Sequence, residues 1–452
     1  MLSRRVLGRR VLGRRVLGRR VLGRRVLGRR VLAAAGLVLL AALLGVLPLL
    51  PAATASADTV RDQQQWVLDM LNMHSAWQVT EGEGVTVAVI DSGVDPNVAD
   101  LTGSVTAGPD YTGLSTKPGN QNWGEHGTWM ASIIAGHGHD AAFDGIGYDG
   151  IVGIAPKAKI YSVRVIPDKG DPGYRAYNNE PEEHIQAELA EGIRAAVAAH
   201  ARVISMSIGY SAPSGAVRAA IQYAYSHGVV LVASSGNSGD NDTQHGRASG
   251  GLAPVSFPAE YPGVISVGAV TIDRKATSFS SGNLSVRVAA PGKAVPAEGR
   301  NGLYYTVDGT SPACAVVAGV AALLEADYPK ITPAQVTRAL TGTAQQTPPG
   351  GYDVLTGFGI VDAEAALAKA GQLMKERPQG SQVGLSTHFG GGRAAVPAAP
   401  VTPRGDGWLL TFILVALVSM AAVGAGLAGL ARTRDRAPGG RAPGGRDGNR
   451  AA

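Results

Sequence analysis

The sequence predicts an α/β fold, a mostly parallel β-sheet sandwiched between helices, plus one C-terminal transmembrane helix. Short apolar runs recur without the polar alternation of a half-exposed sheet, as strands covered on both faces require. Stretches of helical length separate these runs, and strands that alternate with helices pair in parallel. With 45% hydrophobic residues and a single Cys, the chain is neither disordered nor stapled by disulfides.

The candidate elements follow one another through residues 76–372, which we predict to be one large domain. Its candidate strands are the apolar runs 85–90, 160–165, 203–208, 229–233, 264–270 and 284–289. Helices are expected near 126–136, 182–200, 214–227 and 312–327. Thr332 and Pro333 open another helix, because a capping hydroxyl followed by proline is typical of a helix start.

The N-terminus has the composition of an export signal. It repeats Arg-Arg-Val-Leu-Gly five times from Arg4 to Gly28 and continues into an apolar run at 31–50. Small residues at 55–57 resemble a cleavage site, so residues 1–57 are predicted to be a signal peptide with RRVLG repeats. Two alternatives stay open: the apolar run is long enough to remain as an anchor, and Ser3-Arg4-Arg5 permits twin-arginine export. Residues 58–75 then form a short N-terminal extension.

The C-terminus predicts a membrane anchor. Residues 373–407 are rich in Gly, Pro, Ala and Ser, which is typical of a linker. Residues 408–431 carry no charge, and 24 residues of helix are long enough to cross a hydrocarbon core of about 30 Å. The alternative is a buried core helix. Because residues 432–452 are basic, the positive-inside rule puts this tail in the cytoplasm and the central domain outside the cell membrane, which the chain crosses once.

The net charge of +6 comes from the two ends of the chain. Residues 1–57 hold 12 Arg and no acidic residue, and residues 432–452 hold six Arg and two Asp. This leaves 23 basic and 33 acidic residues between them, so the central domain is acidic. A nucleic-acid partner is therefore not expected.

Three short motifs lie at the ends of predicted elements, where functional groups of a parallel sheet collect. Asp91 directly follows the buried run 85–90, and an acid there costs desolvation energy unless its charge is used. His126 begins a helix and is followed by Gly127, which allows another segment to approach closely. Ser311 is expected to be a helix N-cap, with Pro312 at the first helical position. Taken singly, each has an ordinary structural explanation: a turn, a surface histidine, a cap.

Together, Asp91, His126 and Ser311 follow the chain order of the catalytic triad of subtilisin. The segments around them resemble the successive blocks of subtilisin-like serine proteases over roughly residues 76–370. The blocks include VAVIDSGVD, HGTWMASIIAG, ASSGNSG and GTSPACAVVAG. The whole layout, with signal, short extension, linker and C-terminal membrane helix, resembles the mycosins, the subtilases that accompany type VII secretion systems of actinobacteria.

The resemblance implies a role for each matching residue. Ser311 is the nucleophile, His126 the general base, Asp91 the residue that orients His126, and Asn237 the oxyanion-hole donor. The segments that match the family's substrate-binding groove are Ser207, Ile208, Gly209, Ser235, Gly236 and Ser256. Two positions depart from the family pattern: Glu125 replaces a Gly before His126, and Ala315 replaces a Pro four residues after Ser311.

These observations predict a membrane-anchored extracytoplasmic serine endopeptidase that hydrolyses protein or peptide substrates through an acyl-enzyme. The resemblance to mycosins implies service to a type VII secretion membrane complex. The alternative is a structural stabiliser of that complex, independent of proteolysis. No cofactor and no metal site are expected. Structural calcium, which subtilases often carry on backbone oxygens, is not readable in the sequence. The polar insertion 168–179 is either a substrate or partner loop or a plain surface loop.

Overall fold

The computed structural model of the chain describes residues 59–139, 150–239, 252–376 and 414–421. Contacts divide the chain into two units, Met1–Arg377 and Pro378–Ala452. The predicted signal peptide, the linker, most of the predicted transmembrane helix and the basic tail lie outside the described residues.

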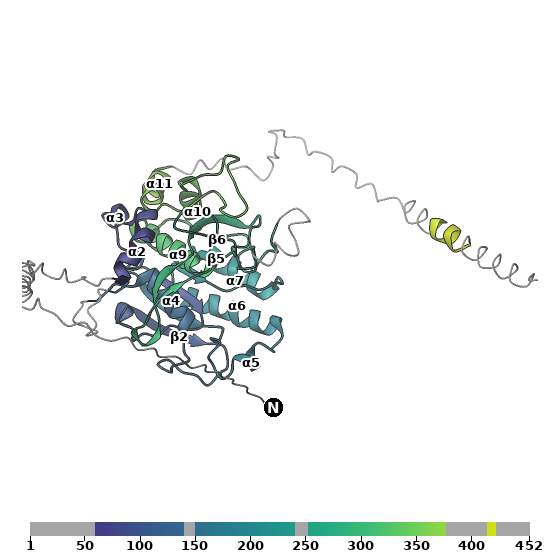
Figure 1. Cartoon of the computed structure of the whole chain (residues 1–452), viewed down its shortest axis with the longest axis horizontal. Coiled ribbons are helices and arrows are strands. Elements are labelled where there is room, and N and C mark those ends of the chain that lie inside the picture. The colour runs from purple at the N-terminus through teal and green to yellow at the C-terminus, as the bar shows by residue number, and fades with distance from the viewer. Residues whose placement is uncertain (1–58, 140–149, 240–251, 377–413, 422–452) are drawn as a thin grey trace, which may run out of the picture. The chain divides into compact units, whose positions relative to one another are not determined.

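The first unit is built on a seven-stranded sheet in the order β2-β3-β1-β4-β5-β6-β7, and each neighbouring pair is parallel (Figure 1). The predicted parallel sheet is therefore confirmed. Its strands are β1 (Thr86–Asp91), β2 (Val105–Asp110), β3 (Lys159–Arg164), β4 (Val203–Met206), β5 (Val230–Ser234), β6 (Val264–Val270) and β7 (Val286–Pro291). A separate antiparallel hairpin joins β8 (Val295–Glu298) to β9 (Tyr304–Val307).

Helices cover both faces of the sheet. Along β1, Val87 and Val89 contribute to one apolar core, whereas Ala88 and Ile90 contribute to the other, as the period of two in a strand requires. The second core is closed by α6 (Glu182–Ala198) and α7 (Gly215–Ser226). The first core is closed by α4 (Glu125–Ala135), α9 (Thr310–Asp327), α10 (Pro333–Gly342) and α11 (Ala363–Lys375).

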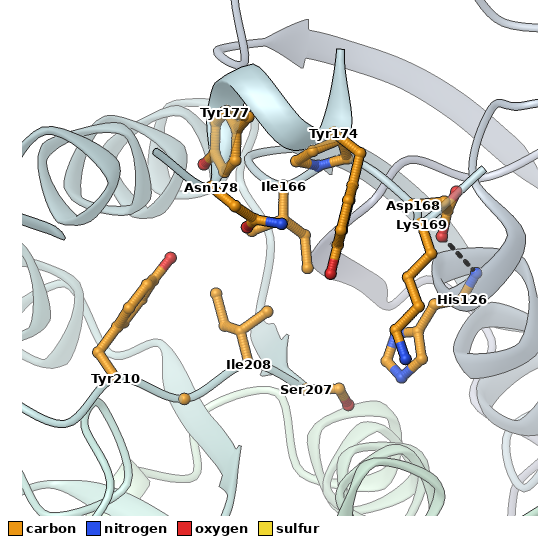
Figure 2. A pocket seen from close by; sticks show the side chains of 12 residues that line it. His126, Ile166, Asp168, Lys169, Tyr174, Tyr177, Asn178, Ser207, Ile208 and Tyr210 are labelled. Carbon is orange, nitrogen blue, oxygen red and sulfur yellow. Dashed lines mark hydrogen bonds between the residues drawn. The ribbon is translucent and has the colours of Figure 1, made fainter. Parts of the chain in front are cut away.

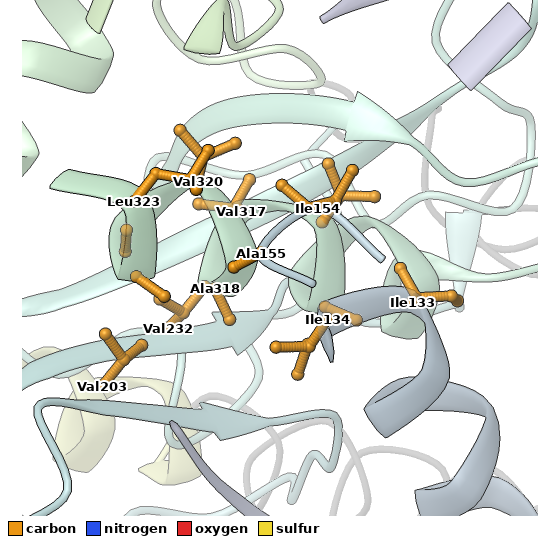
Figure 3. Packing of buried hydrophobic residues seen from close by; sticks show 14 of the residues in the cluster. Ile133, Ile134, Ile154, Ala155, Val203, Val232, Val317, Ala318, Val320 and Leu323 are labelled. Atoms are coloured by element: carbon orange, nitrogen blue, oxygen red, sulfur yellow. The ribbon is translucent and has the colours of Figure 1, made fainter. Parts of the chain in front are cut away.

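Helix α9 runs through the first core and is buried on every side. Figure 3 shows Val317, Val320 and Leu323 packed among side chains of the sheet and of α4. In the described part of the chain, α9 is the helix long and apolar enough to cross a membrane, yet 89% of it is buried inside the protein. It is therefore a core helix, and it holds the residue at its start in a fixed place.

Several elements escaped the sequence prediction. Strand β2 is an edge strand with few apolar residues, and the hairpin β8–β9 is too short to give a clear period. The extension forms α2 (Thr59–Met70) and α3 (Met73–Ala76), whose apolar side chains lie in the first core. Residues 174–177 form the short helix α5. The predicted strand 203–208 ends early, at Met206, so Ser207 and Ile208 lie in the segment after β4.

In the second unit, residues 414–421 are helical and lie within the span predicted to cross the membrane. Its apolar side chains are exposed: 65% for Leu414, 64% for Val418 and 64% for Met420. Exposed apolar side chains that follow one another in this way are typical of a surface that contacts another protein or a membrane.

Candidate active site

Strand β1 and helix α4 bring Asp91 and His126 together. Asp91 ends the strand, is fully buried, and accepts a hydrogen bond from its neighbour Ser92 N at 2.7 Å. The same oxygen lies 2.8 Å from His126 Nδ1, while the other carboxylate oxygen has no hydrogen-bond partner among the described residues. The imidazole keeps 30% of its side-chain surface exposed. With Nδ1 engaged, the other ring nitrogen, Nε2, is the one available to a substrate or nucleophile.

Burial of the imidazole disfavours its charged form, but the charge and hydrogen bond of Asp91 and the charge of Asp168 outweigh this effect. Together they raise the pKa of His126 above its ordinary value. A general base needs this basicity, because it must accept a proton and then carry it as imidazolium. Sequence analysis identified Asp91 and missed Asp168.

Helix α4 begins without a side-chain cap of its own. Its N-cap residue is Gly124, in the left-handed region with φ 70°. Asp168, 42 residues after His126, accepts hydrogen bonds from the first two backbone amides of the helix. Its Oδ2 accepts from Glu125 N at 2.7 Å, and its Oδ1 accepts from His126 N at 3.1 Å. The Gly127 amide donates to Ser92 Oγ at 3.1 Å.

Gly127 has no room for a side chain. A Cβ at this position would lie 2.0 Å from the carbonyl oxygen of Gly93. The close approach expected at Gly127 is therefore present, and it brings the start of α4 against the turn that follows β1.

Helix α9 also begins without a cap of its own, at Gly309. Asn237 supplies the cap from the segment after β5, because its Oδ1 accepts from Thr310 N at 2.8 Å and from Thr310 Oγ1 at 2.9 Å. The helix consequently starts at Thr310, and the predicted N-cap role of Ser311 is wrong: Ser311 lies inside the first turn. Because Thr310 occupies the side-chain oxygen of Asn237, the side-chain nitrogen Nδ2 is oriented to donate to a different acceptor.

Ser311 lies beside the segment after β4. Its Oγ donates to the Ser207 carbonyl at 3.4 Å, and Ser207 Oγ donates to the Ser311 carbonyl at 3.1 Å. Only 9% of Ser311 is exposed. His126 and Ser207 line the same cavity, so the bonds to Ser207 place Ser311 next to one of the residues that line the cleft of His126.

That cleft has a volume of about 340 Å³. Figure 2 shows His126 and Lys169 at one end, Ser207 and Ile208 along one side, and Tyr177 and Tyr210 at the other end. All of the predicted segment Ser207, Ile208 and Gly209 lines it. The opposite wall comes from residues 166–178, so the insertion left open by the sequence is a wall of the cleft.

The buried side chain of Arg164, on β3, holds this wall in place. Arg164 is fully buried, and its Nη2 lies 2.7 Å from Asp171 Oδ2. Its Nη1 lies 3.2 Å from Asp110 Oδ2, and the guanidinium stacks 4.5 Å from the centre of the Trp123 ring. Burial favours a higher pKa for Asp171, but hydrogen bonds from Thr116 and from the Gly173 amide, together with the hydrogen bond and charge of Arg164, outweigh it and lower the pKa. A buried arginine with paired carboxylates fixes the loop relative to the sheet.

The other predicted binding residues, Ser235, Gly236 and Ser256, are not among the residues that line this cavity, but Ser256 lies beside Gly209, which does line it. A Cβ on Gly209 would lie 2.3 Å from Ser256 Oγ, and one on Gly236 would lie 3.6 Å from Ser256 Cβ. Gly236 N donates to Thr310 Oγ1 at 3.2 Å, which ties this group to the start of α9. Ser235 is fully buried, and in the part of the chain that the structure describes its hydroxyl has no hydrogen-bond partner.

The two departures from the family pattern have local explanations. Glu125 forms an ion pair with Arg300 of the segment between β8 and β9, which ties that hairpin to the start of α4. Ala315 lies within an uninterrupted helix α9. Cys314, beside it, is buried, and burial raises the pKa of its thiol to about 11, so the thiol stays neutral.

Sequence patterns of the chain are those of one protein family. The profile of the Subtilase family (peptidase S8) matches residues 82–359, more than half of the chain. The chain therefore belongs to the subtilases, the subtilisin-like serine proteases, and its fold is subtilisin-like. Subtilisin E of Bacillus subtilis (strain 168) is 34% identical over 285 residues, which is 63% of this chain. The match spans 66% of the length of subtilisin E, just under two thirds.

Solved structures extend the comparison to the mycosins. MycP1 from Mycobacterium smegmatis is similar with a TM-score of 0.55 and 30% identity, over 67% of this chain and 84% of MycP1. MycP3, a protease from the type VII (ESX-3) secretion system, is similar with a TM-score of 0.53 and 31% identity, over 67% of this chain and 87% of MycP3. The similarity to mycosins expected from the layout of the sequence is confirmed.

Proposed function

We propose that this chain is a membrane-anchored serine endopeptidase that acts outside the cytoplasm and serves a type VII secretion system. The observation that carries the proposal is the 2.8 Å contact between buried Asp91 and partly exposed His126 in a cleft bordered by Ser311. Membership of the subtilase family supports the chemistry, and similarity to MycP1 and MycP3 supports the setting.

In this proposal an extended peptide lies along Ser207–Gly209, where backbone groups after β4 pair with it and the cleft takes its side chains. His126 Nε2 accepts the Ser311 proton as Oγ attacks the scissile carbonyl. Asp91 holds the ring at Nδ1 and stabilises the imidazolium.

The tetrahedral oxyanion receives hydrogen bonds from the Asn237 amide and from the Ser311 backbone amide at the start of α9. The positive end of the helix adds to this stabilisation. His126 then donates its proton to the leaving amine, the acyl-enzyme forms, and water hydrolyses it by the same steps.

The membrane part of the proposal rests on the C-terminal segment. The uncharged run 408–431, the exposed apolar side chains of helical residues 414–421, and the arginines that follow support a single membrane-spanning helix. The domain would then face the compartment in which exported proteins appear.

The test is hydrolysis of a library of internally quenched fluorescent peptides by the full-length protein in detergent. The matched control is Ser311→Ala, which removes one oxygen atom from a buried side chain. We expect cleavage by the wild type and loss of it in the variant by a factor of about 10⁶. Equal cleavage by both proteins would assign the activity to a contaminant, and no cleavage by a folded wild type would reject the protease.

The alternative function is a structural stabiliser of the secretion complex. In cells that lack the wild-type chain, a Ser311→Ala copy distinguishes the two. A protease loses secretion with this variant, whereas a stabiliser keeps it.

A further inference from the structure

We propose that Asp168 is the positioning residue for His126 and also supports its imidazolium form: its carboxylate caps α4 from the cleft wall, which fixes the imidazole in the cleft and places a negative charge at the start of the helix. The kinetic consequence rests on the proposed function, but the position of Asp168 does not. Family resemblance gave Asp168 no role, and the sequence marked it only as the start of a polar insertion.

Helix α4 needs a cap from another segment of the chain. The initial amides of a helix have no partner inside the helix, and Gly124 offers no side chain to receive them. Three successive amides, of Glu125, His126 and Gly127, are received instead by Asp168 and Ser92. Figure 2 shows the bond between Asp168 and the His126 backbone. The histidine is thus held at its backbone by Asp168 and at its ring by Asp91.

The loop that carries Asp168 is itself held in place by a buried ion pair. Three residues further along, Asp171 is bound at 2.7 Å to the buried Arg164. The same guanidinium stacks on Trp123, the residue before Gly124. Trp123 in turn donates through Nε1 to the Val94 carbonyl, at 3.3 Å. One buried cation therefore ties the loop that carries Asp168 to the segment that leads into α4.

A carboxylate in this place does more than an uncharged cap. A negative charge at a helix N-terminus is stabilising, and here it also acts on the imidazole in the first turn. The charges of Asp91 and Asp168 both favour the imidazolium form of His126. Burial raises the pKa of Asp168 itself, against the effect of the two backbone bonds, so the carboxylate relies on these amides to stay ionised.

Other charged groups near His126 come from each element packed around it. Lys169 lines the same cleft and reaches toward the imidazole (Figure 2). Glu125 is paired with Arg300 of the hairpin segment, so these two charges largely cancel. Asp91 acts from β1 through the direct 2.8 Å contact. Among these groups, Asp168 is the charge that is bonded to the backbone of His126.

The test is a titration of His126 by NMR in the full-length protein, with ¹³C-labelled histidine and a Ser311→Ala background that prevents self-cleavage. The His126 signal is assigned by its loss in His126→Asn. We expect Asp168→Asn, which removes the charge and keeps one acceptor oxygen, to lower the pKa of His126. The control Asp273→Asn removes an exposed carboxylate from the turn after β6 and leaves the titration unchanged. Superimposable titrations of Asp168→Asn and the control would overturn the proposal.

The second arm measures the rate at which a fluorophosphonate labels Ser311 as a function of pH, in proteins with Ser311 intact. We expect Asp168→Asn to label about tenfold more slowly at the plateau and its acid limb to move to lower pH. A slower rate with an unmoved limb would mean a merely structural cap and would overturn the proposal. If Asp168→Asn does not fold, Asp168→Ser, also uncharged, replaces it in both arms.

The two arms separate this inference from the proposed function. If Asp168→Asn lowers the pKa of His126 but the wild type never reacts with the probe, the protease is rejected and the role of Asp168 stands. If the wild type reacts with the probe but Asp168→Asn leaves the pKa of His126 unchanged, the protease stands and the role of Asp168 is rejected.

Discussion

Among the described residues of the first unit, two histidines pair with a buried aspartate in nearly equal geometry. Asp91 and His126 are 2.8 Å apart, and Asp100 and His139 are 2.6 Å apart. In both pairs the aspartate is almost fully buried and binds the histidine through Nδ1. They differ in the surface of the histidine, which is 30% exposed at His126 and 5% exposed at His139.

The neighbours explain this difference. His126 borders a cleft together with Ser207, next to Ser311. Asp100 instead accepts from the Ile151 amide at 2.7 Å and the Tyr304 hydroxyl at 3.1 Å, and its own amide donates to buried Glu298 at 2.9 Å. The second pair therefore joins loops and the β8–β9 hairpin. An Asp–His contact alone does not identify a catalytic site; exposure to a cleft and a nearby nucleophile do.

The largest effect should come from breaking each pair in turn. Asp91→Asn is expected to lower kcat/KM for a cleaved library peptide by about 10⁴-fold, because the imidazole loses the carboxylate that fixes its tautomer and stabilises the imidazolium. Asp100→Asn should leave kcat/KM within a few-fold and lower the free energy of unfolding by about 3 kcal/mol, since it disrupts a buried hydrogen-bonded group. Peptide hydrolysis and urea denaturation of both variants measure this. The comparison fails if Asp100→Asn loses as much activity as Asp91→Asn.

A smaller effect on catalysis is expected from Asn237, the residue predicted to donate to the oxyanion. Asn237→Ala should lower kcat by about 10²- to 10³-fold, because one donor to the oxyanion is lost. It also removes the cap of α9, at a cost of about 1 kcal/mol in unfolding free energy. The matched control is Thr310→Val, which keeps Asn237 and removes only one of its two partners. A loss in Asn237→Ala no larger than in this control would show that the amide acts only as a cap.

The smallest effect on catalysis is expected at Glu298, next to the second pair, where a substitution should change only how stability depends on pH. Burial and the charge of Asp100 raise the pKa of Glu298 to about 8. Because the folded protein holds this proton more tightly than the unfolded chain, the stabilisation is complete below about pH 4.5 and is lost as pH rises through about 8. Glu298→Gln, which stays neutral, should flatten this part of the curve. Denaturation midpoints from pH 5 to 9 measure it, and parallel curves for variant and wild type would contradict it.

Much of this organisation was predictable from local sequence. Continuous apolar runs indicated the parallel strands, and Asp91, His126 and Ser311 were identified because each lies at the end of such an element. Their roles in catalysis remain predictions. The start of α9 was placed two residues late, at Pro312 instead of Thr310, because its cap, Asn237, comes from a segment 73 residues away. Asp168 was missed for the same reason: capping between distant segments leaves no local pattern in the sequence.

The edge strand β2 and the hairpin β8–β9 were missed because a period of two is weak over four to six residues. The second Asp–His pair shows the converse problem. Asp100 lies in a single 3-10 turn (Ala99–Leu101) and His139 follows helix α4, so neither stands in a sequence pattern that marks it, and only the folded chain brings them together.

The most direct test of the account is to locate the site of covalent modification by a fluorophosphonate in the full-length protein. After reaction and proteolysis, mass spectrometry identifies the modified residue. The account predicts one adduct, on Ser311, that is lost in Ser311→Ala and strongly reduced in Asp91→Asn but retained in Asp100→Asn. An adduct on another serine, or none on Ser311 of the folded wild type, would contradict the assignment of the cleft at His126 as the protease active site.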